Sequence, residues 1–228
     1  PILRSSRGII HHLLSLGTER MQRASWLFNF NKEIDLQRHI FSQEQFLFSA
    51  KEVSKLMVIP VQKKFFVKSQ LSRKLHPDEN QALFDIQNYL SDDLLHKVDM
   101  ASMHHSLEVR VPLLDHKVVE FSLNLNRNLK KRGNVSKYLL KQILYEYLPA
   151  HLFDRAKRGF SVPLAKWLRN DLAYLLENYL SEQIIREAGL VKWSIVASIK
   201  AKFKAGKSLY YNRLWALILL HKWWKDNQ

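Results

Sequence analysis

Apolar residues recur along most of the chain at intervals of three and four, the spacing typical of amphipathic helices. The clearest such stretch begins after Ser161, which is suited to cap a helix, and its apolar positions are Pro163, Leu164, Trp167, Leu168, Leu172, Leu175, Leu176 and Tyr179. The same spacing predicts further helices at 136–147, 181–188, 193–203 and 208–225. Weaker amphipathic stretches lie near 9–16, 36–48, 51–58 and 78–90.

Residues that begin and end helices support this interpretation. Ser91 and Asp115 are each placed to cap a helix that follows them, and Gly189 is placed to close the helix at 181–188. The segment Leu107–Pro112 is different, because polar and apolar residues alternate there and Pro112 disfavours helix before it. The sequence therefore predicts an all-α fold with at most two short strands, and an irregular segment at Leu107–Pro112.

The charge of the chain is strongly positive and unevenly distributed. The formal net charge is +15, with six basic residues and no acid between Glu120 and Glu146, and eight basic residues and no acid between Glu187 and Asp226. Solvated helix faces explain most such runs, and a surface that binds phosphate groups explains the others. The lack of acidic residues in these two runs would also fit a fragment whose partner has been removed.

Several classes of site and location are disfavoured by composition. The chain has no cysteine, so disulfides and thiol nucleophiles are excluded, and none of its six glycines lie close enough together to form a phosphate-binding glycine loop. The paired histidines, His11-His12 and His104-His105, lack metal-ligand spacing, so we predict no metal held by this chain alone. The longest apolar run, 214–220, is too short to span a membrane, and no targeting signal is visible, so the cytoplasm is the default expectation.

Four blocks of the sequence together resemble one enzyme family. The longest runs from Tyr89 to Asp115 and includes Ser106-Leu107-Glu108-Val109-Arg110-Val111-Pro112; it resembles the central motif of glutamine-hydrolysing asparagine synthetases. The other blocks follow in the family's order at 133–140, 148–160 and 212–216. The resemblance covers roughly residues 85–225, whereas residues 1–84 match only as the helical region that follows the ATP site. It therefore implies two regions, 1–84 and 85–228.

The resemblance implies a two-domain enzyme. An N-terminal glutaminase releases ammonia, and a synthetase domain of the ATP-pyrophosphatase type (adenine nucleotide alpha hydrolase-like) uses ATP and Mg²⁺ to adenylate the β-carboxylate of aspartate before ammonia displaces AMP. This chain resembles the helical C-terminal half of that domain without its parallel sheet. The missing N-terminal half is then its expected partner, its absence should expose apolar surface, and the fragment alone should be inactive because the family's Ser-Gly-Gly-x-Asp-Ser loop is not present.

The resemblance also implies roles for residues in the central block. The glutamate matching Glu108 lies in the synthetase active site, where a carboxylate could take a proton from ammonium or orient it for attack. The residues matching Ser106 and Leu107 contact the nucleotide, and Arg110 is assigned to the same nucleotide-binding group. From the residues alone, a structural ion pair between Glu108 and Arg110 is the simpler interpretation.

Three lysines outside the central block are further candidates. Lys137 at a helix start and Lys157 just before Gly159 are interpreted as phosphate-binding residues, although exposed surface lysines explain them equally well. Lys207 follows Gly206 and precedes the 212–216 block by five residues, the position from which a lysine reaches the active site in relatives. We therefore assign Lys207 a catalytic role beside Glu108, with a solvated basic turn as the alternative.

Two other functional interpretations stay open. A relative within the same ligase family could act on another carboxylate, since much of the aspartate pocket would lie outside this chain. A basic helical module that binds nucleic acid is supported only by the clustered charge, and its affinity would fall steeply with salt. A homodimer is also left open by the sequence.

Overall fold

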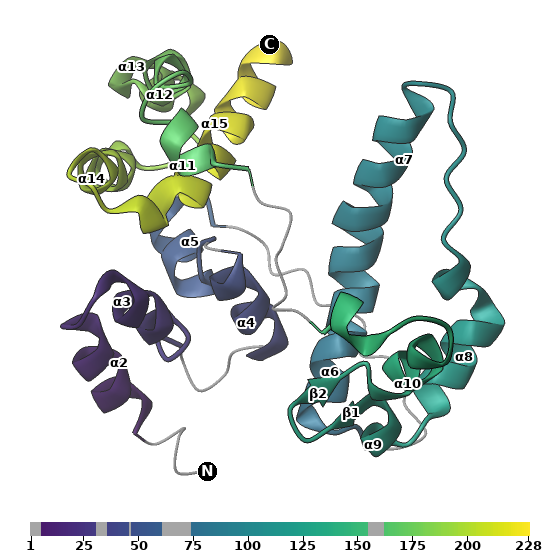
Figure 1. The fold of residues 1–228 in the computed structure, drawn as a ribbon. Helices are drawn as coiled ribbons and strands as arrows, with labels where there is room; N and C mark the ends of the chain where they lie inside the picture. Colours follow the sequence, from purple (N-terminus) through teal and green to yellow (C-terminus); the bar gives the residue numbers. More distant parts are fainter. Residues whose placement is uncertain (1–5, 31–35, 46, 61–73, 155–161) are drawn as a thin grey trace. The chain divides into compact units, whose positions relative to one another are not determined.

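A computed structural model describes residues 6–30, 36–45, 47–60, 74–154 and 162–228 (Figure 1). The chain divides into two compact units, residues 1–90 with 162–228, and residues 91–161. The boundary expected at residue 84 falls near the first change of unit, but residues 162–228 group with the N-terminal helices rather than with the central block. Distant parts of the sequence thus build the first unit together.

The described residues of the first unit form helices joined by turns and loops, with one isolated bridge between Met57 and Val191. Figure 1 shows its C-terminal helices gathered together. Its elements are α2 (Arg7–Ser15), α3 (Glu19–Trp26), α4 (Leu36–Glu44), α5 (Ala50–Leu56), α6 (Pro77–Phe84), α11 (Leu164–Trp167), α12 (Tyr174–Leu180), α13 (Glu182–Ala188), α14 (Trp193–Lys204), the 3-10 turn η4 (Ser208–Tyr210) and α15 (Tyr211–Asp226). The π-helical η1 (Asp85–Leu95) follows α6 and carries the chain into the second unit.

The second unit adds one small sheet to its helices. Its elements are α7 (His96–Met103), η2 (Pro112–Leu114), α8 (His116–Asn124), α9 (Arg127–Lys130), β1 (Lys131–Arg132), β2 (Val135–Ser136), α10 (Tyr138–Tyr147) and η3 (Ala150–Leu152). The two strands pair antiparallel, Lys131 opposite Ser136 and Arg132 opposite Val135, with Gly133 at a positive φ of 57° in the turn. The prediction of a mostly helical chain with at most two short strands is confirmed for the described residues.

The hydrophobic core lies in the first unit. Every buried apolar side chain among the described residues belongs to that unit: Leu56, Leu164, Leu168, Leu176, Leu180, Ile185, Val191, Val196, Ile199, Phe203, Leu209, Leu214, Leu217 and Ile218. Trp193 and Trp215 are partly buried against this core, whereas Trp223 is exposed. The C-terminal helices therefore meet around one apolar centre, with Leu56 of α5 contributing from the N-terminal region.

Local capping signals predicted two helix ends correctly. Gly189 ends α13 at a φ of 62° as expected, and the Ser181 hydroxyl accepts from the Ile184 amide at the start of the same helix. The Asp115 carboxylate accepts from the Lys117 amide at 2.9 Å, which caps α8 as expected. Such caps depend only on residues a few positions apart, so the sequence is sufficient to locate them.

Two expected helix boundaries are wrong. Ser91 begins no helix, because it lies inside η1, which continues from α6. The stretch 163–179 is not one helix: α11 ends at Trp167 and α12 begins at Tyr174. In the intervening turn the Lys166 carbonyl accepts from both the amide and the side chain of Asn170, and the Leu172 amide donates to the Trp167 carbonyl, five residues back instead of four. Leu168 in this turn is fully buried, so tertiary packing stabilises the break.

An arginine at the start of α15 joins the N-terminal helices to the C-terminal core. The Arg213 guanidinium pairs with Glu52 of α5, with Nη1 to Oε1 at 2.9 Å and Nη2 to Oε2 at 3.1 Å. Its Nη2 also donates to the Leu47 carbonyl at 3.3 Å, and the neighbouring Asn212 amide donates to the Gln45 carbonyl at 2.8 Å. The segment between α4 and α5 is thereby fixed to α15.

Aromatic rings enclose the same guanidinium. Its central carbon lies 4.1 Å from the ring centre of Trp26, 5.2 Å from that of Phe48 and 5.6 Å from that of Tyr210. Burial lowers the pKa of Arg213, and the Glu52 carboxylate opposes that change. Because Trp26 belongs to α3 and Tyr210 to η4, one side chain connects four segments of the first unit.

Two buried histidines predict acid sensitivity. Among the described residues, His221 Nε2 and His39 Nδ1 have no hydrogen-bond partner, while their other nitrogens lie 2.8 Å from the Leu217 carbonyl and 3.2 Å from the Leu27 carbonyl. Burial lowers the pKa of both from 6.5, so unfolding takes up protons below about pH 6.5. We expect the free energy of unfolding to be level above that pH and to fall as the pH drops towards the lowered values.

Urea denaturation of the chain between pH 7.5 and 5 tests this expectation. A His39→Phe/His221→Phe variant, whatever its absolute stability, should lose less stability over this range than the unmodified chain. Parallel pH curves for the two proteins would contradict the assignment of the acid sensitivity to these histidines.

Candidate functional site

The turn after α7 holds Ser106 in a strained backbone. The Leu107 amide donates to the Ser102 carbonyl at 3.0 Å and the Ser106 amide to the Met103 carbonyl at 2.9 Å, a pattern that closes the helix. Ser106 lies at the left-handed position of this turn with a φ of 58°, where glycine is the usual residue. Such strain, of order 1–3 kcal/mol, often occurs at functional sites. The turn directs the chain into the segment that carries Glu108.

Glu108 and Arg110 form an ion pair in an exposed, extended segment. Arg110 Nη2 lies 2.7 Å from Glu108 Oε1 and its Nε donates to the same oxygen at 2.8 Å, while the two side chains are 85% and 70% exposed. The segment before η2 is extended as predicted but pairs with no strand in the described chain. The geometry is that of the structural ion pair. In the chain alone, solvent screens this pair strongly.

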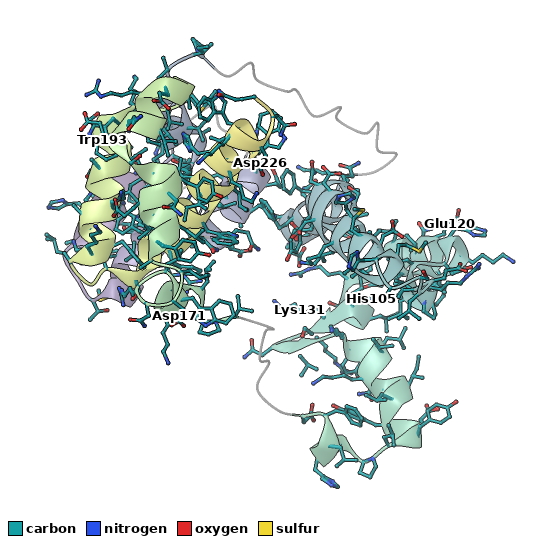
Figure 2. The ribbon with its side chains drawn as sticks, turned by 90° about the horizontal axis from the view of Figure 1, so that it is seen from above. His105, Glu120, Lys131, Asp171, Trp193 and Asp226 are labelled. Atoms are coloured by element: carbon teal, nitrogen blue, oxygen red, sulfur yellow. The ribbon has the colours of Figure 1, made fainter. Side chains whose placement is uncertain are left out.

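Lys137 stands at the junction of the hairpin and α10. It is the N-cap residue of α10 with a φ of 55°, and among the described non-glycine residues only it and Ser106 have positive φ values. Its side chain is exposed. An open hollow of about 370 Å³ lies beside this junction, lined by Asn128, Leu129, Arg132, Gly133 and Tyr138. The side chains of this unit are drawn in Figure 2, where Lys131 marks the hairpin and His105 the turn after α7.

Lys207 lies in the other unit, in a tight loop between α14 and η4. The Lys207 amide donates to the Lys202 carbonyl at 3.1 Å, and Gly206 has a φ of 96° that favours glycine. Arg169 holds this loop, since its Nη2 donates to the Gly206 carbonyl at 2.9 Å and to the Ser208 hydroxyl at 3.0 Å. The Lys207 side chain is exposed, and Arg169 fixes the turn that carries it.

The predicted site residues thus fall in three places. Ser106, Leu107, Glu108 and Arg110 follow one another in the second unit, where Lys137 also lies, whereas Lys207 belongs to the first unit. Lys157 lies outside the described residues. The residues of the central block lie together because they are neighbours in the sequence. The role of each predicted site residue stays a prediction.

Some paired charges were missed by sequence reasoning. Lys200, in the acid-free run, is buried and donates to the carbonyls of Leu176 at 3.0 Å and Leu180 at 2.8 Å, which satisfies the end of α12. Glu177 binds both Lys200 and Lys204, and the hydrogen bond from Lys204 is the largest cause that lowers the Glu177 pKa. Part of the basic run is therefore structural, which weakens the argument for a nucleic-acid surface.

Within the described parts of the chain, no three His, Asp or Glu side chains are grouped to hold a metal ion. No described helix has both the length and the apolar character needed to cross a membrane.

Comparison with known proteins identifies the class. The model of the family described as asparagine synthase matches residues 10–225, so the chain belongs to the asparagine synthase family. It is 29% identical over 143 residues to asparagine synthetase (glutamine-hydrolysing) 1 of Bacillus subtilis, covering 63% of this chain and 22% of that protein. The comparison with solved structures found no significant match to the chain.

Two further relatives agree with this assignment. A Mycobacterium tuberculosis protein with the provisional name of glutamine-hydrolysing asparagine synthetase is 34% identical over 140 residues, which cover 61% of this chain and 21% of that protein. The corresponding enzyme of Gallus gallus is 32% identical over 99 residues, covering 42% of this chain and 17% of its own. The chain thus spans about a fifth of the length of these relatives.

Proposed function

We propose that this chain forms the helical C-terminal part of the synthetase domain of an ATP-dependent asparagine synthetase. The whole enzyme would adenylate the β-carboxylate of aspartate and then form the amide with ammonia released from glutamine. The observation that carries the proposal is the family match over residues 10–225, which includes the strained turn and exposed segment that begin at Ser106. The parallel sheet of the ATP-pyrophosphatase type would lie in the part of the relatives that this chain does not span.

Each candidate residue has a proposed role in that reaction. Glu108 would accept a proton from ammonium or orient it, and Lys207 would stabilise the negative charge that develops on the departing pyrophosphate and the oxyanion. The residues proposed to contact the nucleotide and its phosphates are Ser106, Leu107, Arg110, Lys137 and Lys157. Both contacts from Arg110 are to Oε1 of Glu108, and a largely exposed pair of this kind can separate at low cost when a substrate binds.

The described residues suit ATP better than Mg²⁺. Exposed cations such as Arg110, Lys137 and Lys207 fit phosphate oxygens, and Lys137 stands at a helix start where phosphate is favoured. No described group of carboxylates suits a metal ion, so we assign none of these residues to Mg²⁺. If the enzyme uses the metal, its ligands would come from outside the described residues.

The second unit supports a dependence on further protein. None of its described side chains is buried. Its exposed large apolar residues are Val98, Met100, Met103, Leu107, Val109, Val111, Leu113, Val118, Phe121, Leu123, Leu129, Val135, Leu140, Ile143, Tyr147, Leu148, Leu152 and Phe153. Apolar surface of this kind usually marks an interface. We propose that the rest of the synthetase covers it.

Exchange of pyrophosphate into ATP tests the proposal. A full-length protein that contains this sequence should catalyse aspartate-dependent exchange and form asparagine, whereas the 228-residue chain alone should show neither. The physical reason is that the chain provides cations but no phosphate-binding glycine loop. Exchange by the isolated chain would contradict the proposal that part of the ATP site lies outside this chain. Exchange that depends on a different carboxylic acid would favour the relative with another substrate.

Lys207→Ala should lower asparagine synthesis in the full-length enzyme by about a hundredfold, the scale of losing one preorganised charge at a transition state. The matched control is Lys202→Ala, because Lys202 lies on the preceding helix turn and its side chain contacts the Tyr210 ring at 5.6 Å. This control should change synthesis less than twofold. Similar small losses from both variants would make Lys207 an ordinary surface charge.

A further inference from the structure

Two polar side chains of the second unit converge on one carboxylate oxygen of Asp154. Asp154 Oδ1 accepts a hydrogen bond from Lys141 Nζ at 2.6 Å and another from the Tyr145 hydroxyl at 2.7 Å. Lys141 and Tyr145 are four residues apart, so they share one face of α10. The Asp154 amide in turn donates to the Ala150 carbonyl at 2.9 Å. The cluster therefore fastens the middle of α10 to the turn at η3.

Electrostatics favour the charged form of this cluster. The hydrogen bond from Lys141, followed by that from Tyr145, lowers the pKa of Asp154 below its ordinary value. The bond to Asp154 raises the pKa of Lys141 and of Tyr145. Asp154 is thus a carboxylate and Lys141 an ammonium at neutral pH. The attraction between these two charges favours their contact.

Lys137 is the N-cap residue of the fastened helix. The Lys141 amide donates to the Lys137 carbonyl at 2.9 Å, so the residue that binds Asp154 also makes the first backbone bond of α10. On the other side, Arg132 Nη1 donates to the Tyr138 hydroxyl at 2.8 Å, with its guanidinium 5.3 Å from the ring centre. Lys137 stands between these two contacts in its left-handed conformation, which few non-glycine residues adopt without support.

We propose that Asp154 is a positioning residue that holds Lys137 in place for its contact with the nucleotide phosphates. By binding Lys141 and Tyr145, Asp154 fixes the rotation of α10 relative to the η3 turn. That rotation sets the direction in which the Lys137 side chain leaves the helix start. The inference rests on the proposed function of Lys137 and adds to it a cause for the position of that lysine.

Kinetics of the full-length enzyme test the proposal. Asp154→Asn should raise the KM for ATP in aspartate-dependent exchange about three- to fivefold, the scale of one surface ion pair, and change kcat less than twofold. Lys141→Met should do the same, and Asp154→Glu should restore part of the loss. The matched control is Glu146→Gln, which removes an exposed charge from the same helix and should leave both constants unchanged.

A double-mutant cycle shows whether Asp154 acts through Lys137. In a Lys137→Ala background, Asp154→Asn should have no further effect on the KM for ATP. Independent, additive effects would overturn the proposal, and so would an unchanged KM in Lys137→Ala. If the wild-type enzyme shows aspartate-dependent exchange in either case, the wider proposed function stands while the positioning role fails.

Hydrogen exchange of the 228-residue chain gives a readout that does not need catalysis. Asp154→Asn should speed exchange of the first hydrogen-bonded amides of α10, residues 141–145, severalfold relative to Glu146→Gln. Unchanged exchange there would overturn the bracing role even if the enzyme is active. Faster exchange in a protein without aspartate-dependent activity would support the bracing and refute the proposed function separately.

Discussion

Glu108→Ala is expected to lower asparagine formation by the full-length enzyme about a thousandfold, the scale of losing one acid–base group. Glutamine hydrolysis should persist, because that chemistry is proposed for a separate domain. The exposed position of Glu108 means that its removal creates no cavity and breaks only a screened ion pair with Arg110. The loss should therefore come from chemistry rather than from unfolding.

Two measurements separate these causes. The first is asparagine formation against glutaminase activity in the same preparation, since equal loss of both would indicate a folding defect. The second is the matched variant Glu120→Ala on α8, another exposed glutamate of the same unit (Figure 2), which should retain synthesis. If Glu108→Ala were no worse than Glu120→Ala, the structural ion pair would be the whole role of Glu108.

Arg213→Met should destabilise the first unit by about 3 kcal/mol or more, the scale of removing one partner from a buried ion pair. Arg213 is 4% exposed, and its removal leaves the Leu47 carbonyl and the Glu52 carboxylate without this donor and three aromatic rings without their cation. Methionine keeps most of the volume, so the loss reports mainly the polar contacts. Urea denaturation of the 228-residue chain measures it.

The matched control is Arg186→Met. Arg186 also forms an ion pair with a glutamate, Glu182 at 2.6 Å, but both side chains are more than half exposed on α13. Its loss should cost only about 0.5 kcal/mol or less. Equal effects of the two substitutions would contradict the view that Arg213 joins the N-terminal helices to the core.

The residues that the sequence identified most securely depend on short-range patterns. The cap at Asp115 and the helix end at Gly189 need only a side chain or a backbone angle within a few residues. The resemblance of the Tyr89–Asp115 block likewise required no structure, and the family match supports the class it indicated. None of these findings tests the role of Glu108 or Lys207, which stay predictions.

The position of the β1–β2 hairpin was not predicted from the sequence. Alternation of polar and apolar residues favoured an extended segment at Leu107–Pro112, and that segment is extended but unpaired. The strands lie instead at 131–132 and 135–136, where each is only two residues long. Two residues are too few to show any alternation, and the signal is the turn at Gly133, whose positive φ the sequence permits but does not require.

The sequence by itself determined that the chain is mostly helical, where most helices lie and which family it belongs to, because periodicity, caps and motifs are local properties. Tertiary structure decided that 162–228 joins the N-terminal helices in one unit, that the helix breaks after Trp167, and that Arg213 meets Glu52. It also decided that Lys141 and Tyr145 share Asp154. The physical reason is that these contacts join residues whose separation in sequence carries no periodic signal, so only the packing of the folded chain selects them.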